Sequence, residues 1–167
     1  MLNRHGRKKT PRSSALSRRD FLAAGSSAVF SFTIVPRHVL GGVGFVAPSE
    51  RVNLAGIGAG GMGGGDIATH AKNGANVVAL CDVDEARAAG SFNAFPKARR
   101  YKDFREMLDK EARQIDAVTV GTPDHTHAVA SMAAIRAGKH VYCQKPLTHT
   151  LHECRVLTEA ARKAGVA

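Results

Sequence analysis

Residues 52–63 read Val-Asn-Leu-Ala-Gly-Ile-Gly-Ala-Gly-Gly-Met-Gly, and this stretch decides the fold. Its first half, residues 52–57, is an apolar run of strand length. Its second half places Gly58, Gly60 and Gly63 in the spacing G-x-G-x-x-G. Glycines at this spacing, between a strand and a helix, let the backbone approach a pyrophosphate, which the helix N-terminus attracts. The stretch therefore predicts a dinucleotide-binding turn, with Gly61 and Met62 also against the cofactor.

An acidic residue in the right place supports this interpretation, because glycine-rich loops match the spacing easily by chance. Asp82 lies 24 residues after Gly58, directly behind a second apolar run at residues 77–81. A carboxylate there would accept hydrogen bonds from the ribose hydroxyls and repel a 2′-phosphate. The sequence therefore favours NAD as cofactor, while Arg87 nearby leaves NADP open.

The rest of the chain alternates between strand-length apolar runs and helical periodicity. We expect helices from the glycine turn to about Asn73, over 84–89, from Asp103, around 129–133 and from Thr150, and strands near 100–101, at 115–120 and at 140–143. This alternation predicts an α/β fold with a doubly wound parallel sheet of the Rossmann type. The pattern calls for one more strand after Gly165, so we expect residues 50–167 to be a Rossmann domain truncated before its last strand.

Helix ends carry their own signals. Asp84 is expected to cap one helix, and the pairs Asp103–Glu106 and Thr150–Glu153 have the spacing of capping boxes. Gly138 and Gly165 are expected to follow the ends of two other helices.

Two loops follow predicted strands and carry polar side chains. Residues 122–127, Thr-Pro-Asp-His-Thr-His, come after the strand at 115–120, and Gln144-Lys145-Pro146 comes after the strand at 140–143. Ligands of open α/β sheets bind beyond the carboxyl ends of the strands, so both loops are expected at the cofactor.

The first of these loops could also be interpreted as a metal site. It holds Asp124, His125 and His127 at a turn and helix start, where an aspartate more often caps the helix. We therefore expect no metal.

The basic charge is concentrated at the N-terminus. Residues 1–47 hold eight of the 24 basic residues and one of the 14 acidic residues, so the rest of the chain is near neutral and nucleic-acid binding is not expected. Residues 17–22, Ser-Arg-Arg-Asp-Phe-Leu, precede a weakly apolar run of about 14 residues, too short to span a bilayer. We interpret residues 1–47 as a twin-arginine-type leader, with a disordered basic tail as the alternative.

This interpretation has consequences for location and for the cysteines. The leader implies the twin-arginine export machinery as a partner and a periplasmic or exported protein, anchored to the membrane if the leader is not cleaved. Cys81, Cys143 and Cys154 are too few and too irregularly spaced for a disulfide framework or a zinc site. We expect Cys81 and Cys143 to be small core residues.

From about Arg51 to Ala167 the chain resembles the glucose–fructose oxidoreductase / inositol dehydrogenase (Gfo/Idh/MocA) family. The segments that carry the resemblance are the glycine motif at 58–63, residues 81–84 (Cys-Asp-Val-Asp), Thr122-Pro123 with His127, residues 137–141 (Ala-Gly-Lys-His-Val) and Gln144-Lys145-Pro146. The leader resembles those of exported members.

The resemblance implies an NAD(P)-dependent oxidoreductase that transfers a hydride between nicotinamide and a sugar or polyol hydroxyl. It implies that Lys145 is catalytic and that Thr122, Pro123, His127 and Gln144 lie at the cofactor. The family usually has Glu-Lys-Pro where this chain has Gln144-Lys145-Pro146, so the role of Gln144 is open. Family members carry a C-terminal α/β domain that supplies the acid/base residue, most substrate contacts and often homo-oligomer surfaces; it is absent here, so little turnover is expected from this chain alone.

Two other functions stay open at this point. Some relatives in this superfamily use NAD to hydrolyse glycosides through transient oxidation of the sugar. A cofactor-binding module without catalysis is the other alternative.

Overall fold

The computed structural model describes Val35, Gly42 and residues 46–167. The leader predicted over residues 1–47, including its paired arginines, therefore lies almost wholly outside the described residues. The described elements are η1 (Pro48–Glu50), β1 (Asn53–Ile57), α3 (Gly61–Lys72), β2 (Asn76–Cys81), α4 (Glu85–Ala94), β3 (Arg99–Tyr101), α5 (Phe104–Glu111), β4 (Ala117–Val120), α6 (Asp124–Arg136), β5 (His140–Cys143) and α7 (Leu151–Ala164).

The five strands form one parallel sheet in the order β3-β2-β1-β4-β5. The order reverses at β1, which pairs with β2 on one side and β4 on the other. This reversal is the switch point of a doubly wound sheet, where the loops of two neighbouring strands diverge and leave room for a ligand. The predicted fold class is confirmed.

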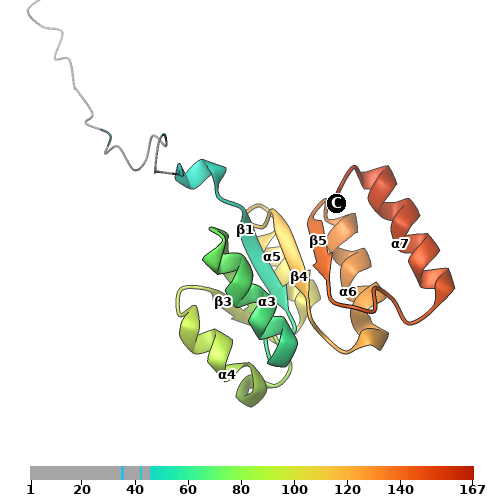
Figure 1. The fold of residues 1–167 in the computed structure, drawn as a ribbon, viewed down its shortest axis with the longest axis horizontal. Coiled ribbons are helices and arrows are strands. Elements are labelled where there is room, and N and C mark those ends of the chain that lie inside the picture. Colours follow the sequence, from blue (N-terminus) through green and yellow to red (C-terminus); the bar gives the residue numbers. More distant parts are fainter. Residues whose placement is uncertain (1–34, 36–41, 43–45) are drawn as a thin grey trace, which may run out of the picture. The chain divides into compact units, whose positions relative to one another are not determined.

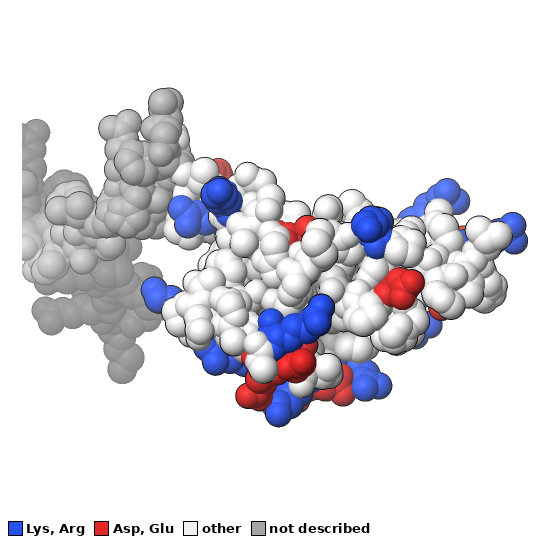
Figure 2. Space-filling model, turned by 60° about the horizontal axis from the view of Figure 1, so that its bottom comes forward, with Lys and Arg blue, Asp and Glu red and all other residues white. Residues whose placement is uncertain are grey.

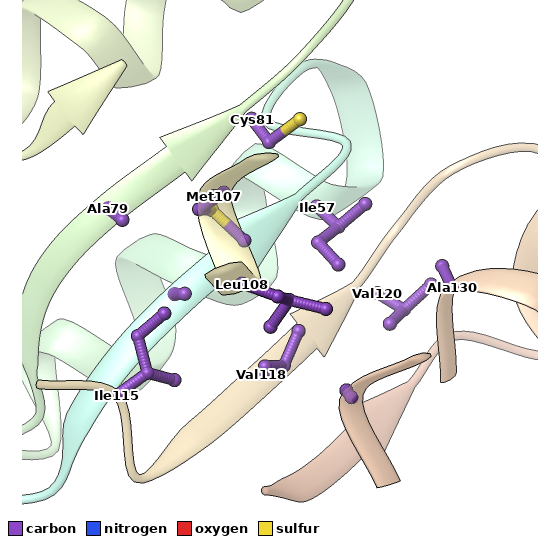
Figure 3. Close-up of a cluster of buried hydrophobic side chains, with 11 residues drawn as sticks. Ile57, Ala79, Cys81, Met107, Leu108, Ile115, Val118, Val120 and Ala130 are labelled. Carbon is purple, nitrogen blue, oxygen red and sulfur yellow. The ribbon is translucent and has the colours of Figure 1, made fainter. Parts of the chain in front are cut away.

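Helices cover both faces of the sheet, which is why its central strands are mostly apolar. On one face Ile67 of α3 and Phe92 of α4 pack with Leu80 of β2, and Figure 1 shows both helices on the near side. On the other face Met107 and Leu108 of α5 contact the sheet (Figure 3).

The strand side of this second core comes from all three central strands. Its buried side chains include Ile57, Cys81, Val118 and Val120, which face α5 and α6 in the same cluster (Figure 3). Cys81 is therefore a core residue as predicted, whereas Cys143 is only partly buried. None of the three described cysteines forms a disulfide.

The outermost helix, α7, packs on α6 through Leu157. Its N-terminus is the predicted capping box, in which Thr150 and Glu153 each hydrogen-bond the backbone of the other, and Gly165 ends it in the left-handed conformation with φ 69°. Two residues after Gly165, the carbonyl oxygen of Ala167 accepts a hydrogen bond from Val141 N of β5 at 2.7 Å.

Several predicted boundaries were wrong. Helix α4 runs to Ala94 and not to residue 89, because Ser91 and Phe92 are buried against the first core face and extend it beyond Gly90. The fourth strand begins at Ala117 and not at Ile115, although Ile115 is buried in the core. Asp124 is the first residue of α6, and Pro123 occupies the cap position.

The predicted capping box at Asp103 does not form. Asp103 caps α5 by accepting from Arg105 N, and the Arg105 guanidinium also binds its carboxylate at 2.9 Å. Glu106 instead pairs with Lys110 one turn further on, at 2.6 Å.

The surface of the domain carries both signs of charge. Figure 2 shows basic and acidic side chains interspersed over the face that the view presents. Within the described residues, no helix combines the length and the apolar character needed to cross a membrane.

Candidate functional site

The glycine turn lies where three strands end. Gly58 follows β1 with φ 83°, a conformation that favours glycine, and its N–H donates to the Cys81 carbonyl of β2 at 2.8 Å. A Cβ at Gly58 would lie 2.6 Å from Thr122 N in the loop after β4. A Cβ at Gly63 would collide with the Gly58 carbonyl oxygen. Both positions therefore need glycine so that helix and loops can approach.

The N-terminus of α3 differs from those of the other described α-helices. Those four helices each have an acidic residue in the first turn, whereas α3 has none. Gly60, at the cap position of α3, has no side chain that could accept from the N–H groups of the first turn. Free N–H groups and the positive end of the helix dipole favour an anion here.

Asp82 holds the glycine turn from the neighbouring strand. Its Oδ2 accepts hydrogen bonds from Ala59 N at 2.8 Å and Gly60 N at 3.1 Å, and its Oδ1 accepts from Asp84 N at 3.0 Å. Each carboxylate oxygen has two acceptor sites, so Oδ2 is fully used and Oδ1 retains one site, which can accept from a ribose hydroxyl. The bond to the turn was not foreseen from the sequence, where only the ribose role was considered.

One cavity of about 580 Å³ contains almost all the predicted site residues. It is lined by the predicted Gly58, Gly60, Met62, Asp82, Thr122, Pro123, His127, Gln144 and Lys145, and in addition by Ile57, Cys81, Val83, Asp84, Arg87, Lys102, Phe104, Gly121 and Asp124. Of the predicted set, Gly61 and Gly63 do not line it, although both belong to the turn that borders it.

The lining residues come from the carboxyl ends of all five strands. Gly58 follows β1, Asp82 follows β2, Thr122 follows β4 and Lys145 follows β5. Lys102, which follows β3, was missed, although the same strand-end rule would have found it.

The side chains that line this cavity differ in their exposure to solvent and in their polar contacts. Met62 is 70% exposed at the start of α3, and Lys145 is exposed and forms no ion pair with any described residue. The Thr122 hydroxyl is buried and has no hydrogen-bond partner within the described part of the chain. Arg87 lies against the turn, since a Cβ at Gly60 would be 2.7 Å from its Cγ.

His127 lines the cavity but its ring nitrogens are engaged. Nδ1 lies 2.7 Å from the Pro146 carbonyl oxygen and Nε2 lies 2.7 Å from the Thr122 carbonyl oxygen. Among the described residues, no group of three or more His, Cys, Asp or Glu is placed to hold a metal ion.

Cys81 brings a thiol to the cavity wall. Burial, and then the nearby carboxylates of Asp103, Asp82 and Glu106, raise its pKa to about 12. The thiolate is the reactive form of cysteine, so this side chain is not a nucleophile at neutral pH.

These residues fit a dinucleotide. The glycines of the turn leave space that side chains would fill, and the first turn of α3 contains no acidic residue. Among the described residues, the buried Thr122 hydroxyl at the cavity wall has no hydrogen-bond partner. The residues that could hold the cofactor are those of the turn for the pyrophosphate and Asp82 for the adenosine ribose. Thr122 and Lys145 line the same cavity from the ends of the next two strands.

Comparison with known proteins agrees with the geometry. Residues 52–167 match the family described as "Oxidoreductase family, NAD-binding Rossmann fold" (GFO_IDH_MocA). Over 116 residues the chain is 40% identical to inositol 2-dehydrogenase 2 of Saccharopolyspora erythraea, an alignment that covers 68% of this chain and 34% of that protein. It is 38% identical over 94 residues to D-apiose dehydrogenase of Paraburkholderia graminis, covering 56% of this chain and 24% of that protein.

Among solved structures, an NAD-binding oxidoreductase from Klebsiella pneumoniae superposes with a TM-score of 0.61 at 35% identity, covering 70% of this chain and 33% of that one. The chain thus spans about a third of the length of its inositol dehydrogenase relatives. With the matched residues running from the first strand to Ala167, the chain belongs to the Gfo/Idh/MocA oxidoreductase family and carries its NAD-binding Rossmann fold.

Proposed function

We propose that this chain is the cofactor-binding part of an exported NAD-dependent oxidoreductase that acts on a hydroxyl of a sugar or polyol. The observation that carries the proposal is the convergence of four strand ends on one cavity, which brings the glycine turn, Asp82, Thr122 and Lys145 together. These residues are far apart in the sequence, and they lie close together because each follows a strand of the same parallel sheet.

Different residues of this chain bind the cofactor and stabilise the substrate oxygen. The N–H groups at the start of α3 bind the pyrophosphate, and the Asp82 carboxylate accepts from the adenosine ribose and repels a 2′-phosphate. Bound NAD⁺ supplies the acceptor for the hydride that leaves the alcohol carbon. Lys145, as an ammonium group, donates to the substrate oxygen and stabilises its alkoxide-like state. The hydroxyl proton passes to a base, which the resemblance to the family assigns to the C-terminal domain of its members.

The substrate class rests on the relatives. Those named above are an inositol dehydrogenase and an apiose dehydrogenase, and both names denote oxidation of a polyhydroxylated compound. The activity of the whole protein is therefore proposed to be oxidation of one secondary or hemiacetal hydroxyl to a carbonyl.

The test is an activity assay on the full-length protein that carries this chain. Incubation with NAD⁺ and a panel of cyclitols and aldoses is expected to give NADH with at least one of them, and Lys145→Ala should lower the rate by about 10²-fold or more. Lys163→Ala, at an exposed site in the last turn of α7, is the matched control and should leave the rate unchanged. Release of phenol from an aryl glycoside without net NADH would contradict the proposal and favour the hydrolase.

Export is the part of the proposal that rests on sequence alone. Residues 17–22 supply the support, because paired arginines before Phe-Leu and a short apolar run suit a twin-arginine signal. Residues 1–47 fused to a folded fluorescent reporter should direct it to the periplasm. Changing Arg18 and Arg19 together to lysine should retain the reporter in the cytoplasm, and unaltered export of that variant would contradict the proposal.

A further inference from the structure

A chain of two hydrogen bonds joins helix α3 to Lys145. Asp66 Oδ2 accepts from Gln144 Nε2 at 2.8 Å, and Gln144 Oε1 accepts from Lys145 N at 3.0 Å. The first bond spans 78 positions of the sequence and is partly buried. The Gln144 side chain therefore connects a carboxylate of α3 to the backbone of the proposed catalytic lysine.

The two bonds define the orientation of the Gln144 amide. With the amide turned over, Oε1 would face the Asp66 carboxylate and Nε2 would face the Lys145 N–H, so that acceptor meets acceptor and donor meets donor. An amide that satisfies both neighbours in only one orientation holds the backbone at Lys145 in one place. The opposite end of the same turn is held by His127 through the Pro146 carbonyl.

The position of Asp66 gives this connection a functional meaning. Asp66 lies on α3 one turn after Gly63, on the helix whose N-terminus borders the cavity. A rigid helix that borders the phosphate site thus also fixes where the lysine turn begins. Catalytic groups need such support, because small misplacements lower the rate strongly.

We infer that Asp66 is a positioning residue for Lys145, acting through Gln144, and that positions 66 and 144 must together hold one acid and one amide. The functional value of holding Lys145 rests on the proposed function above. The requirement for one acid and one amide rests on the geometry alone. A glutamate at position 144 would place two carboxylates face to face, and one negative charge would then have no donor.

The test is a charge exchange between the two positions. The variants are Asp66→Asn, Gln144→Glu and the double variant, in which the new amide at position 66 can donate to the new carboxylate at position 144, while that carboxylate still accepts from Lys145 N. Gln144→Glu should lower the folding equilibrium constant by about tenfold or more, and the double variant should recover to within about threefold of the original chain. Gln114→Glu, an exposed glutamine without a side-chain hydrogen bond among the described residues, is the matched control.

A second readout follows Lys145 directly. In ¹H–¹⁵N spectra the Lys145 amide should shift in both single variants and return toward its original position in the double variant. Additive losses of stability, with no recovery in the double variant, would overturn the inference. Recovery of stability with an unmoved Lys145 amide would also overturn it, because the pair would then be merely structural.

Titration of the same chain and its variants with NADH tests the proposed function separately. If the chain binds no NADH but the double variant recovers the stability lost in Gln144→Glu, the cofactor role is refuted and the acid–amide pairing is supported. If the chain binds NADH but the double variant shows no recovery, the cofactor role is supported and the acid–amide pairing is refuted.

Discussion

The imidazole of His127 is hydrogen-bonded to the carbonyl oxygen of Pro146, with Nδ1 2.7 Å from it. The other ring nitrogen, Nε2, lies 2.7 Å from the carbonyl oxygen of Thr122, and the residue is only 2% exposed. One side chain at the start of α6 therefore joins the loop after β4 to the turn after β5. These are the two loops that carry Thr122 and Lys145, so His127 sets their separation.

Removing this ring should destabilise the domain and weaken cofactor binding. His127→Ala leaves a cavity and removes the ring N–H that donates to one of the two carbonyl groups, a cost of about 2–4 kcal/mol. His125→Ala, two residues earlier on the exposed side of the helix, should change stability by less than about 0.5 kcal/mol. Urea unfolding followed by circular dichroism measures the stability of both variants. Equal losses of stability would mean that the contacts of the His127 ring with the two loops contribute nothing.

Two glycines of α3 should respond in opposite directions to the same substitution. Gly63→Ala drives a Cβ into the Gly58 carbonyl oxygen, so it should destabilise the chain and abolish NADH binding. Gly65→Ala meets nothing within 4 Å and should stabilise the helix by about 0.5–1 kcal/mol. Thermal unfolding and NADH titration of the two variants test this, and a tolerated Gly63→Ala would show that the turn does not need close approach.

Cofactor preference should depend on Asp82. We expect the chain to bind NADH more tightly than NADPH, and Asp82→Ala to narrow that ratio. The ratio is the informative quantity, because Asp82 also holds Ala59 N and Gly60 N, and its loss weakens the turn for both cofactors. Asp84→Ala removes an exposed helix cap and should leave the ratio unchanged. Equal affinities in the original chain would contradict the ribose role.

Glu111 should make the stability of the domain depend on pH. It is 1% exposed, and hydrogen bonds from Tyr101, and then from Arg99, hold the pKa of its carboxyl below the ordinary value of 4.5. A lowered folded-state pKa gives stability that is fully present well above pH 4.5 and is lost as the pH falls through the folded-state pKa. Glu111→Leu should therefore cost about 1–3 kcal/mol at pH 7 and less near pH 4. A difference between the two proteins that stays constant from pH 7 to pH 4 would contradict this.

Much of the site could be predicted from the sequence because its parts obey one geometric rule. Residues after parallel strands meet at one edge of the sheet, so the spacing of Gly58, Asp82, Thr122 and Lys145 behind four apolar runs was sufficient to bring them together. The order of the elements and the glycine turn followed from the same pattern. The roles of the site residues remain predictions, which the experiments above address.

The features that could not be predicted depend on how elements pack. The Asp66–Gln144 bond requires the rotation of α3 about its axis and the path of the turn after β5, and no local pattern encodes either. The length of α4 depends on the burial of Phe92, which offsets the weak helix propensity of Gly90 and Asn93. At Asp103 the carboxylate binds both the backbone N–H and the guanidinium of Arg105, and Glu106 pairs with Lys110 instead of completing a capping box.

Placement of the cofactor at the glycine turn is tested most directly by titrating the ¹⁵N-labelled chain with NADH and observing its backbone amides. We expect saturable shifts that are largest at residues 60–63, at Asp82 and at Thr122, since these amides line the cavity or belong to the glycine turn beside it. Shifts confined to a different cavity, lined by His70 and Tyr142, or no saturable shift at all in a folded chain, would contradict that placement.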